Sequence, residues 1–181
     1  AQFDASDLEV SQHLATSKDG THIPYFQVSK KGLKLNGKNP TLINGYGGFE
    51  LPRLPSYAGA VGRAWCARGG VFVLANIRGG GEFGPGWHQA AIKAGKQKSY
   101  DDFAAVAEDL IASRITRPAR LAMRGGSNGG LLVGAVMLQR PELFGAVVCQ
   151  VPLLDMRRYH RLLAGASWMV VTESGSSPSP A

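Results

Sequence analysis

One segment constrains the fold of this chain more than any other: residues 125–130, which read GGSNGG. A short apolar run, residues 121–123, precedes it, and small and apolar residues with helical spacing, 131–139, follow it. A strand that turns sharply into a helix around G-x-S-x-G presents the serine hydroxyl above a sheet, and the helix N-terminus directs N–H groups at an oxyanion. The pattern predicts a nucleophilic role for Ser127. An incidental serine in a glycine-rich turn is the alternative, and a Walker loop is disfavoured because no lysine follows the last glycine.

The rest of the chain supplies elements that suit such a turn. The first thirty residues read as two extended segments, 9–16 and 22–28, joined by a turn. Beyond them, apolar runs alternate with stretches of helical spacing. The apolar runs are 41–44, 71–75, 121–123 and 145–151, and the helical stretches are 58–68, 99–113 and 131–139. Strands alternating with helices imply parallel crossovers. We therefore predict an α/β protein with a mostly parallel sheet and helices on both faces, which together with the elbow is the α/β-hydrolase fold.

Composition excludes several other classes of protein. The net charge of +7 comes from scattered basic residues without an arginine-rich run, so we expect no nucleic-acid partner. No stretch of 18 apolar residues exists, and we expect no membrane association. Cys66 and Cys149 fit no metal or redox spacing, so we expect neither a metal nor a cofactor. Without a signal peptide at the N-terminus, the expected location is cytoplasmic, or periplasmic if a leader has been removed.

Two further glycine-rich turns precede the elbow. Residues 45–49 (GYGGF) directly follow an apolar run, where hydrolases with such an elbow place an oxyanion donor, and Tyr46 can supply a phenolic O–H. Residues 78–82 (RGGGE) follow the next run, and we expect Arg78 and Glu82 to brace the rim of the site by a charge pair.

These turns belong to a larger set of motifs. Residues 45–49, 75–84 (ANIRGGGEFG) and 125–130, followed by 139–145 (QRPELFG) and 164–168 (AGASW), resemble in this order the catalytic domain of the prolyl oligopeptidase family of serine peptidases. The resemblance runs from about residue 15 to residue 169. It implies a hydrolase that cleaves after proline in short peptides.

The resemblance also implies a role for each matching residue. Ser127 corresponds to the nucleophile, and the backbone N–H of Asn128 and the hydroxyl of Tyr46 correspond to the oxyanion hole. Phe49 corresponds to an aromatic wall of the proline pocket. Trp168 corresponds to an indole that stacks on the proline ring, a role that suits a flat apolar partner.

The general base is the missing part. In this fold the acid and the histidine follow the serine on loops after later strands. Only one histidine, His160, follows Ser127. We therefore expect activity impaired by loss of the family's acid and histidine, with His160 as a candidate substitute base. Two alternatives stay open: a small carboxylesterase acting on activated or short-chain esters, and a non-catalytic fragment that self-associates.

The domain organisation follows from where the resemblance stops. Residues 1–169 are expected to form a partial α/β-hydrolase domain, incomplete at the C-terminus and without a β-propeller. Residues 170–181 are rich in serine and proline and are expected to be disordered. An incomplete sheet leaves an open edge, so besides a short peptide or ester substrate we expect a homo-oligomer formed through that edge.

Overall fold

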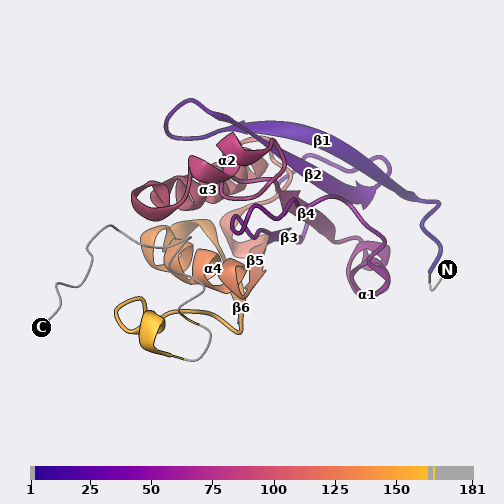
Figure 1. Cartoon of the computed structure of the whole chain (residues 1–181). Helices are drawn as coiled ribbons and strands as arrows, with labels where there is room; N and C mark the ends of the chain where they lie inside the picture. Colours follow the sequence, from indigo (N-terminus) through magenta and orange to yellow (C-terminus); the bar gives the residue numbers. More distant parts are fainter. Residues whose placement is uncertain (1–2, 163–164, 166–181) are drawn as a thin grey trace, which may run out of the picture.

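A six-stranded mixed sheet forms the centre of the molecule (Figure 1). The computed structural model describes residues 3–162 and residue 165. The strands are β1 (Leu8–Thr16), β2 (His22–Lys30), β3 (Thr41–Asn44), β4 (Val71–Ala75), β5 (Leu121–Gly126) and β6 (Ala146–Gln150), in the spatial order β1-β2-β4-β3-β5-β6. The strands from β4 to β6 pair in parallel, whereas β1 and β2 are antiparallel. The predicted α/β fold with a mostly parallel sheet is confirmed.

Helices lie on both sides of this sheet (Figure 1). The α-helices are α1 (Gly59–Ala64), α2 (Pro85–Gln89), α3 (Gln97–Ala112) and α4 (Asn128–Gln139), and short 3-10 turns are η1 (Cys66–Arg68), η2 (Lys93–Gly95), η3 (Pro118–Arg120), η4 (Pro141–Leu143) and η5 (Tyr159–Arg161). The long helices α3 and α4 pack against each other and against the sheet. Helix α3 begins two residues before the expected start, and Ser99 in its first turn donates its hydroxyl to the carbonyl of Arg78.

The two faces of the sheet are buried to different degrees. Side chains alternate along β3 and β5, so that Ile43 and Met123 are fully buried towards α3 and α4. The opposite face carries half-buried residues such as Leu42 and Phe72. The hydrophobic core therefore lies on the α3–α4 side, and the other side keeps room for a cavity.

The edges of the sheet also differ. The β1–β2 hairpin is held against α3, whereas β6 pairs only with β5 within the described part of the chain and most of its residues are exposed.

No helix among the described residues is long and apolar enough to cross a bilayer. The predicted boundary between residues 169 and 170 lies outside the described residues.

Candidate active site

Ser127 occupies the sharp turn between β5 and α4. Its backbone has φ 58° and ψ −119°, a conformation that costs a non-glycine residue on the order of 1–3 kcal/mol. The turn is held by hydrogen bonds from Ser127 N to the Gln150 carbonyl (3.1 Å) and from Gly130 N to the Ser127 carbonyl (2.9 Å). Among the described residues, the Ser127 hydroxyl has no hydrogen-bond partner. The fold thus imposes strain on this residue, and no other described residue holds its Oγ.

The glycines of residues 125–130, the nucleophile elbow, are needed for packing at three of four positions. A Cβ atom at Gly125 would overlap the carbonyl of Gly129. A Cβ at Gly129 would lie 2.6 Å from the Gly45 carbonyl oxygen, and one at Gly130 would lie 2.7 Å from that of Gln150. At Gly126 the nearest atoms would be 3.8 Å away, so the packing there does not require glycine.

Residues 45–50, the oxyanion loop, lie directly against this elbow. The Asn128 side chain is fully buried and donates its Nδ2 to the Tyr46 carbonyl at 2.5 Å. Gly48 packs so closely on the Asn128 amide that a Cβ there would overlap it. The structure therefore brings Tyr46 and Asn128 together next to Ser127, although the sequence separates them by about eighty residues.

Residues 78–82, a second glycine-rich turn, pack against the oxyanion loop and support it. Gly79 has φ +97° and approaches the Gly47 carbonyl, and Gly81 approaches the Glu50 carbonyl. The Glu50 N–H donates to the Gly79 carbonyl at 3.3 Å. This support matters because Phe49 and Glu50 both have a left-handed φ of 54°.

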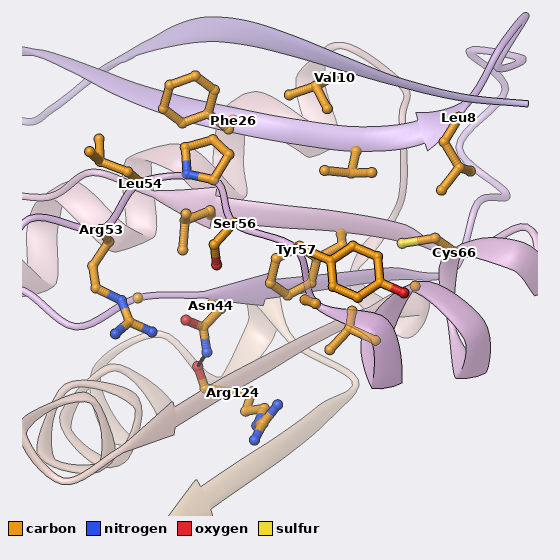
Figure 2. A pocket seen from close by; sticks show the side chains of 18 of the residues that line it. Leu8, Val10, Phe26, Asn44, Arg53, Leu54, Ser56, Tyr57, Cys66 and Arg124 are labelled. Atoms are coloured by element: carbon orange, nitrogen blue, oxygen red, sulfur yellow. Dashed lines mark hydrogen bonds between the residues drawn. The ribbon is translucent and has the colours of Figure 1, made fainter. Parts of the chain in front are cut away.

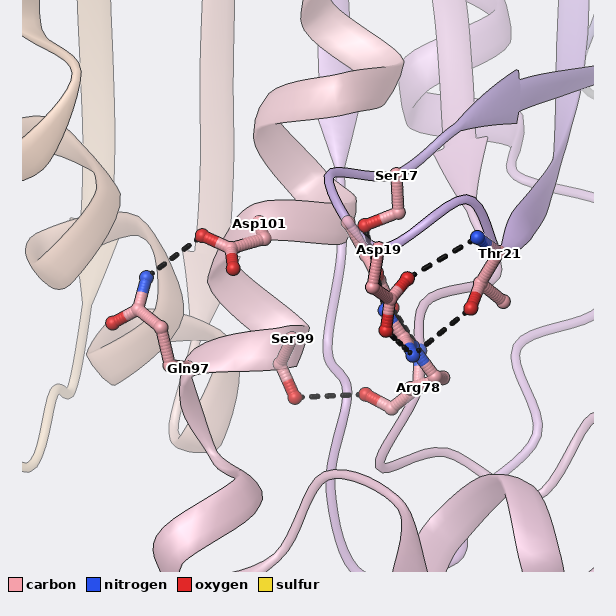
Figure 3. A network of polar contacts seen from close by, with 8 residues as sticks. Ser17, Asp19, Thr21, Arg78, Gln97, Ser99 and Asp101 are labelled. Atoms are coloured by element: carbon pink, nitrogen blue, oxygen red, sulfur yellow. Dashed lines mark hydrogen bonds and ion pairs between the residues drawn. The ribbon is translucent and has the colours of Figure 1, made fainter.

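Arg78 anchors that supporting turn in a buried network (Figure 3). Its guanidinium donates to both carboxylate oxygens of Asp102, at 2.6 and 2.9 Å, and to Asp19 at 2.6 Å. These partners lie on α3 and on the β1–β2 turn. The hydrogen bond from the Arg78 guanidinium holds the pKa of Asp19 well below its usual range. The predicted charge pair between Arg78 and Glu82 is wrong.

Glu82 has partners other than Arg78. It accepts a hydrogen bond from the Arg53 backbone N–H at 2.9 Å. Burial raises the pKa of this carboxyl group. Glu82 thus fastens the segment after the oxyanion loop instead of neutralising Arg78.

A cavity of about 830 Å³ opens on the less buried face of the sheet (Figure 2). Apolar side chains from β1, β2 and residues 54–57 line most of it, and Tyr46 and Gly126 reach its wall. At its polar end, Asn44 donates to the Arg124 carbonyl at 3.1 Å, and the Arg53 guanidinium lies 5.7 Å from the centre of the Tyr46 ring. The site therefore adjoins an open, largely apolar space.

The structure does not bring the candidate base to the serine. His160 lies exposed in η5, where its Nε2 accepts a hydrogen bond from Arg161 Nε at 3.2 Å. No hydrogen bond joins it to Ser127 within residues 3–162. The upstream His88 places its Nδ1 2.7 Å from the Gly79 carbonyl, so its ring serves the loop support. Trp168 lies outside the described residues, and Phe49 sits half-buried on the oxyanion loop.

Sequence reasoning missed one functional candidate, Lys96. Its ammonium donates to the Gly47 carbonyl at 2.7 Å, and burial lowers its pKa to about 8. No local pattern marks this lysine, because its partner lies 49 residues away in the chain. Among the described residues, no group of three or more histidine, cysteine, aspartate or glutamate side chains is arranged to hold a metal ion.

A mostly parallel sheet with a strained serine at a strand-to-helix elbow, beside a glycine-tyrosine loop, defines the serine hydrolases of the α/β-hydrolase fold. Comparison with known families identifies the group within this class. The model of the prolyl oligopeptidase family matches residues 58–177. The chain belongs to the prolyl oligopeptidase family of serine peptidases.

Individual relatives agree with this assignment. The chain is 56% identical over 180 residues, 99% of its length, to an uncharacterized peptidase of Sinorhizobium fredii. It is 43% identical over 167 residues, 92% of its length, to a prolyl endopeptidase of Elizabethkingia miricola. A solved post-proline cleaving enzyme from Rickettsia typhi superposes with a TM-score of 0.92 at 52% identity, covering 95% of this chain and 25% of that one. The chain spans 24% of the length of both of these curated relatives.

Proposed function

We propose that this chain carries the nucleophile and the oxyanion hole of a prolyl oligopeptidase-type serine peptidase that cleaves after proline in short peptides. One observation carries the proposal: Ser127 is held in a strained elbow whose next residue, Asn128, is bonded to the backbone of Tyr46. Strain of this kind persists where surrounding contacts enforce it, and it is concentrated at reactive sites. The family membership supports the same role for Ser127.

The proposed reaction is acyl transfer. Ser127 Oγ attacks the carbonyl carbon of the scissile bond, and its proton passes to a general base, which no described residue supplies. The Asn128 N–H and the Tyr46 hydroxyl donate to the oxyanion of the tetrahedral intermediate. Collapse of the intermediate expels the amine, which takes a proton, and water then hydrolyses the ester on Ser127.

Substrate choice is proposed from the resemblance and from the names of the relatives. Phe49 and Trp168 would form aromatic walls for a proline ring, which is flat, apolar and uncharged. Relatives named prolyl endopeptidase and a neighbour described as a post-proline cleaving enzyme support this specificity. A short peptide is therefore the proposed substrate.

Peptidase activity of this chain is proposed to be weak, because no described histidine or carboxylate is hydrogen-bonded to Ser127. Oxyanion stabilisation and substrate positioning alone retain a rate advantage of about a thousandfold over water when triad members are removed. An activated ester tolerates the loss best, since its leaving group departs without a proton. Slow hydrolysis of p-nitrophenyl esters is thus the expected residual activity, and it is also what the carboxylesterase alternative requires.

Labelling with a fluorophosphonate tests the role of Ser127. We expect one equivalent of label on the unaltered chain and none on Ser127→Ala. Ser56→Ala is the matched control, because Ser56 is exposed in the cavity wall and should leave labelling unchanged. Label retained by Ser127→Ala would exclude this serine as the nucleophile, and an unlabelled parent chain would favour the non-catalytic alternative.

Self-association is a second proposal, carried by the β6 edge. Val148 in β6 and Val151 just after it are 44% and 81% exposed. An open strand beside exposed apolar side chains favours pairing with a second copy. Sedimentation should show a dimer or larger species as concentration rises, and a monomer across a hundredfold range would contradict the proposal.

A cytoplasmic location is proposed as well. Cys66 and Cys149 are unpaired, as expected in a reducing compartment, although removal of a leader would allow a periplasmic location. Fractionation of cells that express the natural gene would distinguish the two.

A further inference from the structure

Lys96 makes an unusual contact with the oxyanion loop, at the residue that follows Tyr46. It precedes α3, and its ammonium donates to the Gly47 carbonyl oxygen at 2.7 Å. The side chain is largely withdrawn from water. Within residues 3–162, no carboxylate forms an ion pair with it. Among the described residues, a half-buried positive charge is therefore held by a single carbonyl group.

Stability of the helix does not explain this lysine. The N-terminus of a helix carries partial positive charge and favours acidic side chains, so a lysine immediately before the 16-residue α3 opposes the helix dipole. Removing an ammonium from water without a carboxylate partner is also unfavourable, and burial lowers the pKa of Lys96 to about 8. The contact with Gly47 is thus made although both the helix dipole and the hydration of the ammonium oppose it.

The carbonyl that Lys96 holds belongs to the most constrained part of the oxyanion loop. Gly47 has φ +61°, and its missing side chain leaves space that Ile77 occupies. On one side of it, the Tyr46 carbonyl accepts from Asn128; on the other, the Gly48 carbonyl accepts from Leu51 N at 3.1 Å. Three consecutive carbonyls are therefore fixed, and Lys96 supplies the only charged donor among these three hydrogen bonds.

We propose that Lys96 is a positioning residue that fixes the Gly47 carbonyl and thereby holds the Tyr46 hydroxyl where it can donate to the oxyanion at Ser127. The inference rests on the proposed function for the oxyanion role. The strained backbone at Phe49 and Glu50 is the reason a clamp is needed, because such a segment relaxes once its contacts weaken. A charge-assisted hydrogen bond is about twice as strong as a neutral one, which suits the task.

Lys96→Met tests the clamp, because methionine keeps the apolar stem and removes the donor and the charge. Hydrogen exchange followed by mass spectrometry should show the amides of residues 45–51 exchanging at least tenfold faster, with α3 unchanged. The melting temperature should stay equal or rise, since a half-buried charge without a carboxylate partner is lost. Lys98→Met is the matched control, because Lys98 is exposed two residues further along. Lys96→Arg should restore most of the protection.

The labelling rate links the clamp to chemistry. Fluorophosphonate labelling of Ser127 should slow at least tenfold in Lys96→Met and recover in Lys96→Arg. Unchanged exchange at residues 45–51 would overturn the proposal. Faster exchange throughout the chain, together with a lower melting temperature, would also overturn it, because that result indicates a lysine with a purely structural role. If the parent chain does not label, the proposed function fails, and the exchange data still decide whether Lys96 holds the loop.

Discussion

The two sides of the proposed site are built very differently. The nucleophile elbow and the oxyanion loop are fixed by buried hydrogen bonds, by glycine contacts that no other residue permits, and by the Arg78 network behind them. Residues 151–162, the segment after β6, instead expose most of their apolar side chains and bond mainly within their own turns. The described residues therefore hold the proposed nucleophile and the proposed oxyanion hole firmly in place, and none of them is hydrogen-bonded to Ser127 as a base.

The ion pairs of the two regions express the same contrast. The Arg78 and Asp102 side chains are 6% and 0% exposed, whereas Arg158 and Asp155 are 72% and 35% exposed. A buried pair that loses one partner leaves an uncompensated charge, while a surface pair is screened by water and contributes little. Matched substitutions in the two regions therefore test this difference.

The largest expected effect is that of Asp102→Asn. The change leaves the buried Arg78 guanidinium with Asp19 as its sole carboxylate partner in the network, and it should lower the free energy of unfolding by about 3–5 kcal/mol. Urea denaturation followed by circular dichroism measures this. Asp155→Asn is the control and should cause no measurable change. Equal losses in both variants would remove the distinction between the regions.

Gly125→Ala should have the second-largest effect and lower the free energy of unfolding by about 3 kcal/mol. The added methyl group overlaps the Gly129 carbonyl and forces the elbow to shift. Gly126→Ala should stay within about 1 kcal/mol of the parent chain, since its methyl group meets nothing closer than 3.8 Å. The same denaturation experiment compares the two variants. Similar stability for both would mean that the elbow is less tightly packed than its geometry indicates.

Raising the pH should stabilise the folded chain through Lys96. Its folded pKa is about 8 and its ordinary value is 10.5, so between these values the unfolded chain binds a proton that the folded chain has released. The free energy of unfolding therefore rises with pH in this window, by on the order of 2 kcal/mol after allowance for partial solvent access. Denaturation of the parent chain and Lys96→Met at pH 7.5 and 10.5 isolates the contribution. Parallel pH profiles for the two proteins would contradict it.

The smallest effect is expected for His160→Ala. This exposed ring has no hydrogen bond to Ser127, so the rate of fluorophosphonate labelling should change by less than twofold. Labelling reactions that are quenched at successive times and read by gel fluorescence measure the rate. A tenfold decrease would instead restore His160 as a base and favour the esterase alternative.

Features that depend on residues close together in the chain could be predicted from the sequence. Runs of consecutive apolar residues predicted the strands because burial on both faces leaves no polar position, and the glycines around Ser127 predicted the elbow because a tight turn excludes side chains. The oxyanion loop was recognisable for the same reason. The motifs in their order were specific enough to indicate the family, and the comparisons confirmed it.

Contacts between groups that lie far apart in the chain could be read only from the three-dimensional fold. Arg78 and Glu82 are close in sequence, yet the guanidinium pairs with Asp19 and Asp102 because β4, α3 and the β1–β2 turn converge on it. The contact of Lys96 with Gly47 follows from the packing of α3 behind the oxyanion loop, and no local pattern encodes it. Such polar partners are fixed by the geometry of burial, since each buried charge must find a donor or acceptor within about 3 Å wherever the fold provides one.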